Sequence, residues 1–137
     1  MSTKKAIGLS FLFIIISTAL EYLAMFAWGP VFAVIFVAPV VEEGLRRAAV
    51  KRGFPYLFTT IFVIMEYISS MMMFNDLGID PGSLAILRIP AIGMHFICAL
   101  IQVKLHRKGG RWSKTGLVIA IILHFFFNVV MTKLIPE

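Results

Sequence analysis

Long apolar runs separated by short polar segments determine what this chain can fold into. Five such runs lie at about 6–27, 31–50, 55–74, 83–105 and 113–134. Each approaches or exceeds the roughly 20 residues that a helix needs to cross a bilayer. With 60% hydrophobic residues and a mean hydropathy of +0.94, the chain is far more apolar than a soluble domain. We therefore expect one all-α domain over residues 1–137, a polytopic transmembrane helix bundle of about five spans.

Basic residues are distributed unevenly between the expected spans. The amino-terminal tail and the segments after the second and fourth runs are rich in Lys and Arg, whereas the first connection has neither and the third contains Asp76 and Asp80. This alternation predicts a cytoplasmic amino terminus. The net charge of +6 therefore reflects topology, and we expect no nucleic-acid partner. The expected location is a bacterial or archaeal plasma membrane, crossed several times and with the lipid bilayer as a partner.

Two adjacent carboxylates, Glu42 and Glu43, lie within the second apolar run. A charged side chain at the bilayer centre costs about 3 kcal/mol, so such residues usually pair with a partner or face a functional cavity. Glu66, His95 and His124 lie in the next three runs. Counted from the expected cytoplasmic ends, Glu43 and these three lie about ten residues deep, or roughly 15 Å, close to the midplane. We therefore predict that they form one site.

Helical spacing predicts which charged side chains pair near this site. Arg46 and Arg47 follow Glu42 and Glu43 by four residues each, so we expect two ion pairs along one helix. A simpler interpretation is that these four residues form an ion-paired patch near the membrane interface. Glu21, at the far end of the first run, is expected to be a solvated residue at the outer interface.

Two further spacings involve the histidines. Arg88 precedes His95 by seven residues and Asn128 follows His124 by four, so each pair shares one face of its helix. In one interpretation Arg88 supports the site, and in the other it anchors its helix at the outer interface.

A carboxylate with two imidazoles in a polar intramembrane pocket suits the activation of water. A glutamate can act as the general base, and neutral His or Asn side chains can donate hydrogen bonds to a developing oxyanion. The same groups could instead hold zinc, with Glu43, His95 and His124 as ligands and one open position. The chain has no H-E-x-x-H sequence, so the soluble metalloprotease pattern gives no support. We favour a site without a metal or other cofactor.

The candidate residues also carry a family resemblance through the order of their motifs. The ordered elements are Glu42-Glu43-x-x-Arg46-Arg47, Phe62-x-x-x-Glu66, Arg88 followed by His95, and His124-x-x-x-Asn128. They resemble the motifs of the PrsW family of intramembrane proteases. That family belongs to a superfamily with the CAAX prenyl endopeptidases (CPBP or Abi proteins) and a scaffold subunit of gamma-secretase. The glutamate that ends the second motif favours the PrsW-type branch, because the CAAX-type enzymes resemble Phe-x-x-x-His there.

The resemblance implies a membrane-embedded endopeptidase that cleaves a membrane-anchored protein or peptide. One member of the glutamate pair would activate water, and Glu66 would assist or position it. His95 and His124 would orient water or stabilise the oxyanion, and Asn128 would complete the oxyanion site. The substrate would resemble an anti-sigma factor in the PrsW-type branch, or a prenylated carboxyl terminus in the CAAX-type branch.

Two other classes of function are compatible with the same residues. The first is a non-catalytic scaffold or immunity-type membrane protein of the same superfamily. The second is a bis-His haem protein that uses His95 and His124, or a proton pathway through the buried acids. Three acids close to the histidines argue against haem. An oligomer is compatible with every one of these interpretations.

Overall fold

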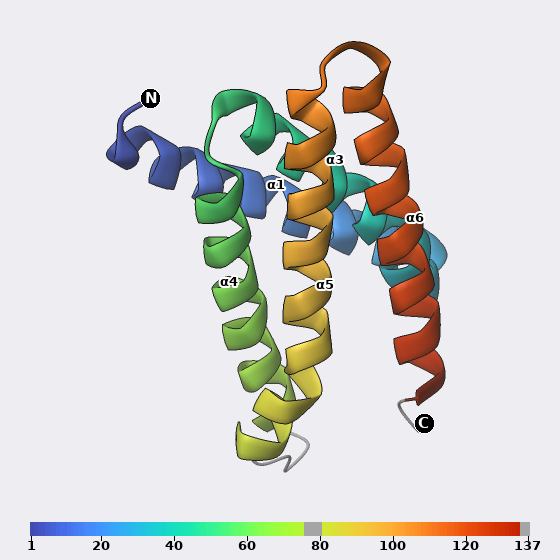
Figure 1. The fold of residues 1–137 in the computed structure, drawn as a ribbon. Helices are drawn as coiled ribbons and strands as arrows, with labels where there is room; N and C mark the ends of the chain where they lie inside the picture. The colour runs from blue at the N-terminus through green and yellow to red at the C-terminus, as the bar shows by residue number, and fades with distance from the viewer. Residues whose placement is uncertain (76–80, 135–137) are drawn as a thin grey trace.

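The computed structural model describes residues 1–75 and 81–134, and almost all of these residues are helical (Figure 1). The elements are α1 (Thr3–Trp28), α2 (Pro30–Phe32), the π-helical turn η1 (Ala33–Val37), α3 (Ala38–Arg52), α4 (Pro55–Asn75), α5 (Pro81–Arg107) and α6 (Gly110–Leu134). The described residues contain no strand, so the prediction of an all-α bundle is confirmed. The turn expected between the third and fourth runs falls on residues 76–80, outside the described part of the chain.

Four of the helices are long and apolar enough to cross a membrane: α1, α4, α5 and α6. The protein is therefore a multi-pass membrane protein by the length and composition of its helices. Large apolar side chains cover the outside of the bundle, where Phe26 is 97% exposed and Leu23 is 67% exposed. Such a surface fits lipid rather than water.

The second apolar run differs from the other four. It is helical from Pro30 to Arg52, but η1 interrupts the α-helix, and α3 carries two acidic and four basic residues. It is not among the four helices that are long and apolar enough to span a bilayer. A fifth crossing therefore stays a prediction. The run does have the central position that its charges suggested, since α3 packs against α1, α4, α5 and α6.

Glycine and proline residues set the helix boundaries. Gly29 and Gly53 adopt φ values of 88° and 82°, which favour glycine, and each ends a helix. Pro30 and Pro55 then begin the next helices, where a missing backbone N–H costs nothing. The helices therefore begin and end within a few residues of the positions expected from the sequence.

Two packing contacts hold the helices around a central polar cluster. Phe13 of α1 meets Phe58 of α4 edge to face, with ring centroids 6.0 Å apart. On the other side, α5 and α6 run antiparallel and side by side (Figure 1). Small residues allow this close approach: Ala120 is fully buried, and a Cβ on Gly116 would lie 3.0 Å from the Cβ of Leu105.

Candidate functional site

The two adjacent glutamates occupy different environments on α3. Glu43 is fully buried and holds three helices together. Arg46 donates to its Oε1, Gln102 of α5 donates to its Oε2 at 2.8 Å, and Nδ1 of His124 on α6 lies 3.0 Å from Oε1. Both oxygens of Glu43 are therefore committed to partners on α3, α5 and α6.

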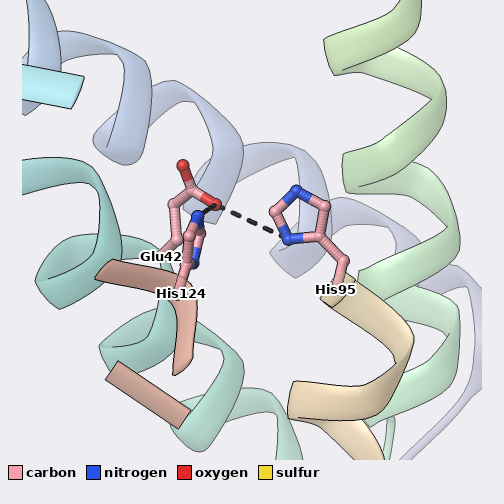
Figure 2. Close-up of side chains that lie close together, drawn as sticks. All are labelled: Glu42, His95 and His124. Carbon is pink, nitrogen blue, oxygen red and sulfur yellow. Dashed lines mark ion pairs between the residues drawn. The ribbon is translucent and has the colours of Figure 1, made fainter. Parts of the chain in front are cut away.

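Glu42 lines a cavity instead. Figure 2 shows its carboxylate beside His95 and His124. It is 7% exposed, and its Oε2 is buried without a hydrogen-bond partner among the described residues. This oxygen lies 3.8 Å from Nδ1 of His95 and 3.9 Å from Nε2 of His124. Of the two carboxylates, Glu42 is the one with an uncommitted oxygen aimed at the imidazoles.

The prediction of two ion pairs at i,i+4 spacing along α3 is wrong. Arg46 pairs with Glu43, three residues earlier, and not with Glu42. Arg47 donates to the backbone oxygen and the hydroxyl of Ser113, where α6 begins. The reason lies in the neighbouring helices: Arg46 points into the bundle, where it is fully buried, whereas Arg47 lies beside the start of α6. The arginines therefore join α3 to other helices, so the four charges do not form a patch of α3 alone.

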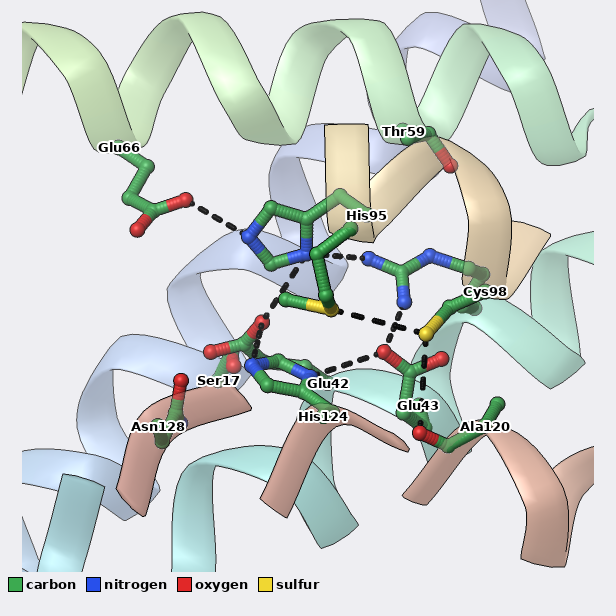
Figure 3. A network of polar contacts seen from close by, with 12 residues as sticks. Ser17, Glu42, Glu43, Thr59, Glu66, His95, Cys98, Ala120, His124 and Asn128 are labelled. Carbon is green, nitrogen blue, oxygen red and sulfur yellow. Dashed lines mark hydrogen bonds and ion pairs between the residues drawn. The ribbon is translucent and has the colours of Figure 1, made fainter. Parts of the chain in front are cut away.

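Each imidazole is held by a carboxylate through the ring nitrogen farther from Glu42 (Figure 3). Nε2 of His95 lies 2.9 Å from Oε2 of Glu66, and Nδ1 of His124 contacts Glu43. Arg46 also donates to Nδ1 of His95 at 3.0 Å. Because a guanidinium only donates, this contact makes Nδ1 the acceptor and leaves the proton of His95 on Nε2, where it is donated to Glu66. The protein thus fixes the tautomer of His95.

Arg88 belongs to the same polar network. Its guanidinium donates to Oε1 of Glu66 at 2.7 Å and to the hydroxyl of Ser70, so it links α5 to α4. Glu66 therefore sits between Arg88 and His95, and each of its oxygens has one partner. Arg88 therefore contacts Glu66 and Ser70 of α4, and its role as a supporting residue of the site stays a prediction.

Asn128 of α6 forms a hydrogen bond with the π-helical turn η1. Its Nδ2 donates to the carbonyl oxygen of Val34 at 2.8 Å. A π turn is frequent at functional sites, and it places one extra residue in the helix. Asn128 also lines the cavity, with one of its two amide protons used by Val34. One amide proton is left for another acceptor.

The cavity has a volume of about 300 Å³ and is lined by both polar and apolar side chains. Glu42, His95 and His124 form part of the polar lining. The apolar lining consists of Val34, Ala38, Ala91, Met94, Phe127 and Met131. Such a mixture of apolar wall and a few convergent polar groups is typical of a binding or catalytic site.

Glu21 also lines this cavity, which corrects the expectation of a solvated interfacial residue. α1 packs across α3 and α4, and this packing brings its carboxyl-terminal half to the cavity wall. The hydroxyl of Ser17 donates to Glu21 Oε1 at 2.7 Å. The i,i+4 spacing of these two polar residues in an apolar run was a signal that could have indicated an inward face.

Gln102 is a second residue that sequence reasoning missed. Its amide nitrogen contacts both the backbone oxygen of Glu43, at 3.2 Å, and the carboxylate. It follows His95 by seven residues, so the two share a helix face, and this spacing could have identified it.

Three groups could hold a metal ion: Glu42, His95 and His124, whose ligand atoms lie within 4.8 Å of one another. This set contains Glu42 in place of Glu43 of the expected zinc set, because Arg46 and Gln102 occupy the oxygens of Glu43. The carboxylates behind both imidazoles fit the usual surroundings of zinc-bound histidine. The contact from Arg46 to His95 Nδ1 does not, since that lone pair would have to bind the metal.

The fold and the cluster define an all-α multi-pass membrane protein with a buried Glu–His–His site that lines a cavity. Comparison of the chain with protein-family models, with curated proteins and with solved structures finds no match.

Proposed function

We propose that this protein is a membrane-embedded peptidase that hydrolyses a peptide bond of a membrane-anchored protein, with Glu42 as the residue that activates water. One observation carries the proposal: the buried Oε2 of Glu42, which has no hydrogen-bond partner among the described residues, lies between two oriented imidazoles that line the same cavity as Glu42. The order of these residues along the chain resembles that of the PrsW-type intramembrane proteases.

The positions of the polar groups suit a sequence of proton transfers. Water attacks the scissile carbonyl carbon and gives a proton to Oε2 of Glu42. Because the carboxylate of Glu43 accepts from Nδ1 of His124, Nε2 of His124 faces Glu42 and can pass the proton to the leaving nitrogen as the C–N bond breaks. The second amide proton of Asn128 is available to the oxyanion of the tetrahedral intermediate.

The rest of the cavity suits a substrate from the membrane. Its apolar lining, which includes Met94, Phe127 and Met131, can bury the apolar side chains of a membrane segment. The substrate class is therefore a peptide segment within or beside the bilayer.

The test uses Glu42→Gln in purified protein reconstituted with a library of membrane-anchored reporter peptides. The amide keeps the size of the side chain but cannot accept a proton, so we expect cleavage to fall about 100-fold or more. Val40→Ile, on the same helix but 54% exposed and outside the cavity lining, is the matched control and should cleave at close to the wild-type rate. Equal cleavage by Glu42→Gln and wild type would show that Glu42 is not the base.

Zinc hydrolysis is a second candidate for the same site. It is favoured by the carboxylates that hold the outer nitrogens of His95 and His124, an arrangement common behind zinc ligands. When bound, zinc would supply a Lewis acid and lower the barrier to forming hydroxide. Zinc content of protein purified without chelator, compared with that of His124→Gln, separates the candidates: stoichiometric metal that disappears in the variant would favour zinc.

The bis-His haem alternative gains no support from the ring geometry. His95 and His124 contact each other edge to face, with centroids 5.2 Å apart and planes at 87°. Axial ligands of one haem lie on opposite faces of the macrocycle, and this direct contact leaves no room for it.

A further inference from the structure

The cavity carries more acidic than basic groups. Glu21, Glu42 and Glu66 reach it from α1, α3 and α4, whereas Arg88 is the single arginine or lysine in its described lining. Arg88 is paired with Glu66 at 2.7 Å. Two carboxylates therefore line the cavity without a Lys or Arg partner.

Within the described residues, no further Lys or Arg lines the cavity to offset these two groups. Arg46 forms an ion pair with Glu43 and is fully buried, and it is not one of the residues that line the cavity. His95 accepts from Arg46, so its ring is neutral in this arrangement. His124 lies between Glu42 and Glu43, with Nε2 3.9 Å from Glu42 and Nδ1 3.0 Å from Glu43.

Glu21 is left without a cation. Within residues 1–75 and 81–134, its side chain has one hydrogen-bond partner, the neutral hydroxyl of Ser17, and makes no ion pair. The bond to Ser17 uses Oε1, so Oε2 stays available. Glu42, whose Oε2 has no hydrogen-bond partner in the described part of the chain, lines the same cavity. An acidic cavity with low-dielectric walls concentrates cations and repels anions.

We infer that the cavity accepts a protonated amine or a guanidinium, and that Glu21 is the residue that selects it. This inference rests on the proposed function where it concerns the substrate: the cleaved segment would be apolar, to match Met94, Phe127 and Met131, and would carry a Lys, an Arg or a free amino group beside the scissile bond. Glu21 then determines specificity, while Glu42 performs the chemistry.

The test measures the electrostatic preference of the cavity without any turnover. A cysteine is placed in the cavity wall by Met131→Cys, in a background where the fully buried Cys98 is replaced by alanine. Its rate of reaction is measured with two methanethiosulfonates, one carrying a trimethylammonium and one a sulfonate. Nearby acids suppress the thiolate equally for both reagents, so the ratio of the two rates reports the charge of the cavity.

We expect the ratio of cationic to anionic rate to exceed that of free cysteine by about tenfold or more. Glu21→Gln should lower the ratio several-fold, and Glu21→Asp, which keeps the charge, should restore it. A ratio equal to that of free cysteine, or one unchanged in Glu21→Gln, would overturn the inference. Because no cleavage is measured, this result is independent of whether Glu42 is the base.

Two further measurements test a second position in the cavity wall and the presence of a metal ion. Val34→Cys, on another part of the cavity wall, repeats the measurement if Met131→Cys does not fold. If both cysteines are unreactive toward both reagents in folded protein, the cavity does not admit an organic cation and the inference is wrong. All rates are measured with and without a chelator; a cation preference that appears only after chelation would overturn the inference by identifying a metal ion as the cation of the cavity.

Discussion

Replacement of Glu43 by glutamine tests the division of labour between the two adjacent glutamates. Glu43 and Arg46 are both fully buried, and Glu43 is the carboxylate with which Arg46 forms its ion pair. Glu43→Gln keeps the volume of the side chain and removes the charge, so the buried guanidinium loses its counter-ion. Breaking a buried pair on one side costs about 3–5 kcal/mol, because the remaining charge is left uncompensated.

The measurement is thermal unfolding of the detergent-solubilised protein, followed by helical circular dichroism. For a chain of about this length 1 kcal/mol corresponds to a few degrees, so Glu43→Gln should unfold about 10 °C below wild type. Glu42→Gln is the matched control. Since Oε2 of Glu42 has no hydrogen-bond partner within residues 1–75 and 81–134, we expect the control to change the free energy of unfolding by less than about 1 kcal/mol.

The two variants should therefore separate stability from activity. Glu43→Gln should lower stability strongly, and Glu42→Gln should abolish cleavage while leaving stability close to wild type. The opposite pattern, a stable Glu43→Gln and a destabilised Glu42→Gln, would refute the assignment of Glu43 as the residue that joins α3, α5 and α6.

Further predictions concern the frame around the site. Asn128→Ala removes the bond to the Val34 carbonyl and should lower the free energy of unfolding by about 1 kcal/mol, measured by the same melts; no change would show that the π turn needs no brace. Gly116→Ala places a Cβ 3.0 Å from the Cβ of Leu105 and should cost about 1–3 kcal/mol by crowding α5 against α6. Gly93→Ala, with no atom within 4 Å of the added Cβ, is its control and should be neutral or stabilising; equal losses in both alanine variants would refute the crowding.

Most of the fold could be predicted from hydropathy and from the glycine and proline residues at the helix ends. Runs of apolar residues set the lengths of the long helices, and residues such as Pro30, Gly53 and Pro55 set their ends. Hydropathy was least informative for the second apolar run. The helix of this run is interrupted by η1, and its charged side chains include the buried Glu43 and Arg46. A hydropathy pattern reports how apolar a segment is, but it does not report whether protein or lipid surrounds it.

The site could be predicted as a set but not in its detail. Counting residues inward from the loops indicated that Glu66, His95 and His124 lie at one depth, and the structure brings them together around α3. The same count could not choose between Glu42 and Glu43, which differ in depth by about 1.5 Å. The choice depends on Gln102 and Arg46, long side chains whose direction is fixed by tertiary packing.

The position of Glu21 could not be predicted for a related reason. A lone acid near a helix end is usually solvated, and the sequence of α1 does not specify the angle at which that helix crosses its neighbours. Packing of Phe13 against Phe58 and Phe54 fixes this crossing and turns Glu21 inward. Specific aromatic packing, which the apolar pattern does not encode, therefore decides whether this carboxylate meets water or the cavity.

Arg46 is the residue that decides between the two chemical versions of the site. It neutralises Glu43, donates to Nδ1 of His95 and so occupies the lone pair that a metal would need. Arg46→Met removes both the donor and the positive charge beside the ligand set. We expect this variant to bind zinc about tenfold or more tightly than wild type, as the surroundings of a metal site commonly change affinity by such factors.

The affinity is measured by competition with a zinc indicator, and Arg46→Lys, which keeps a positive charge, is the control. Bound zinc would also offset the charge left on Glu43, so Arg46→Met should melt at a higher temperature with zinc than without it. Equal zinc affinity in wild type and Arg46→Met would mean that the guanidinium does not exclude the metal. The argument for a glutamate base over a zinc-bound water would then lose its main structural support, because the rest of the network around His95 and His124 fits either chemistry.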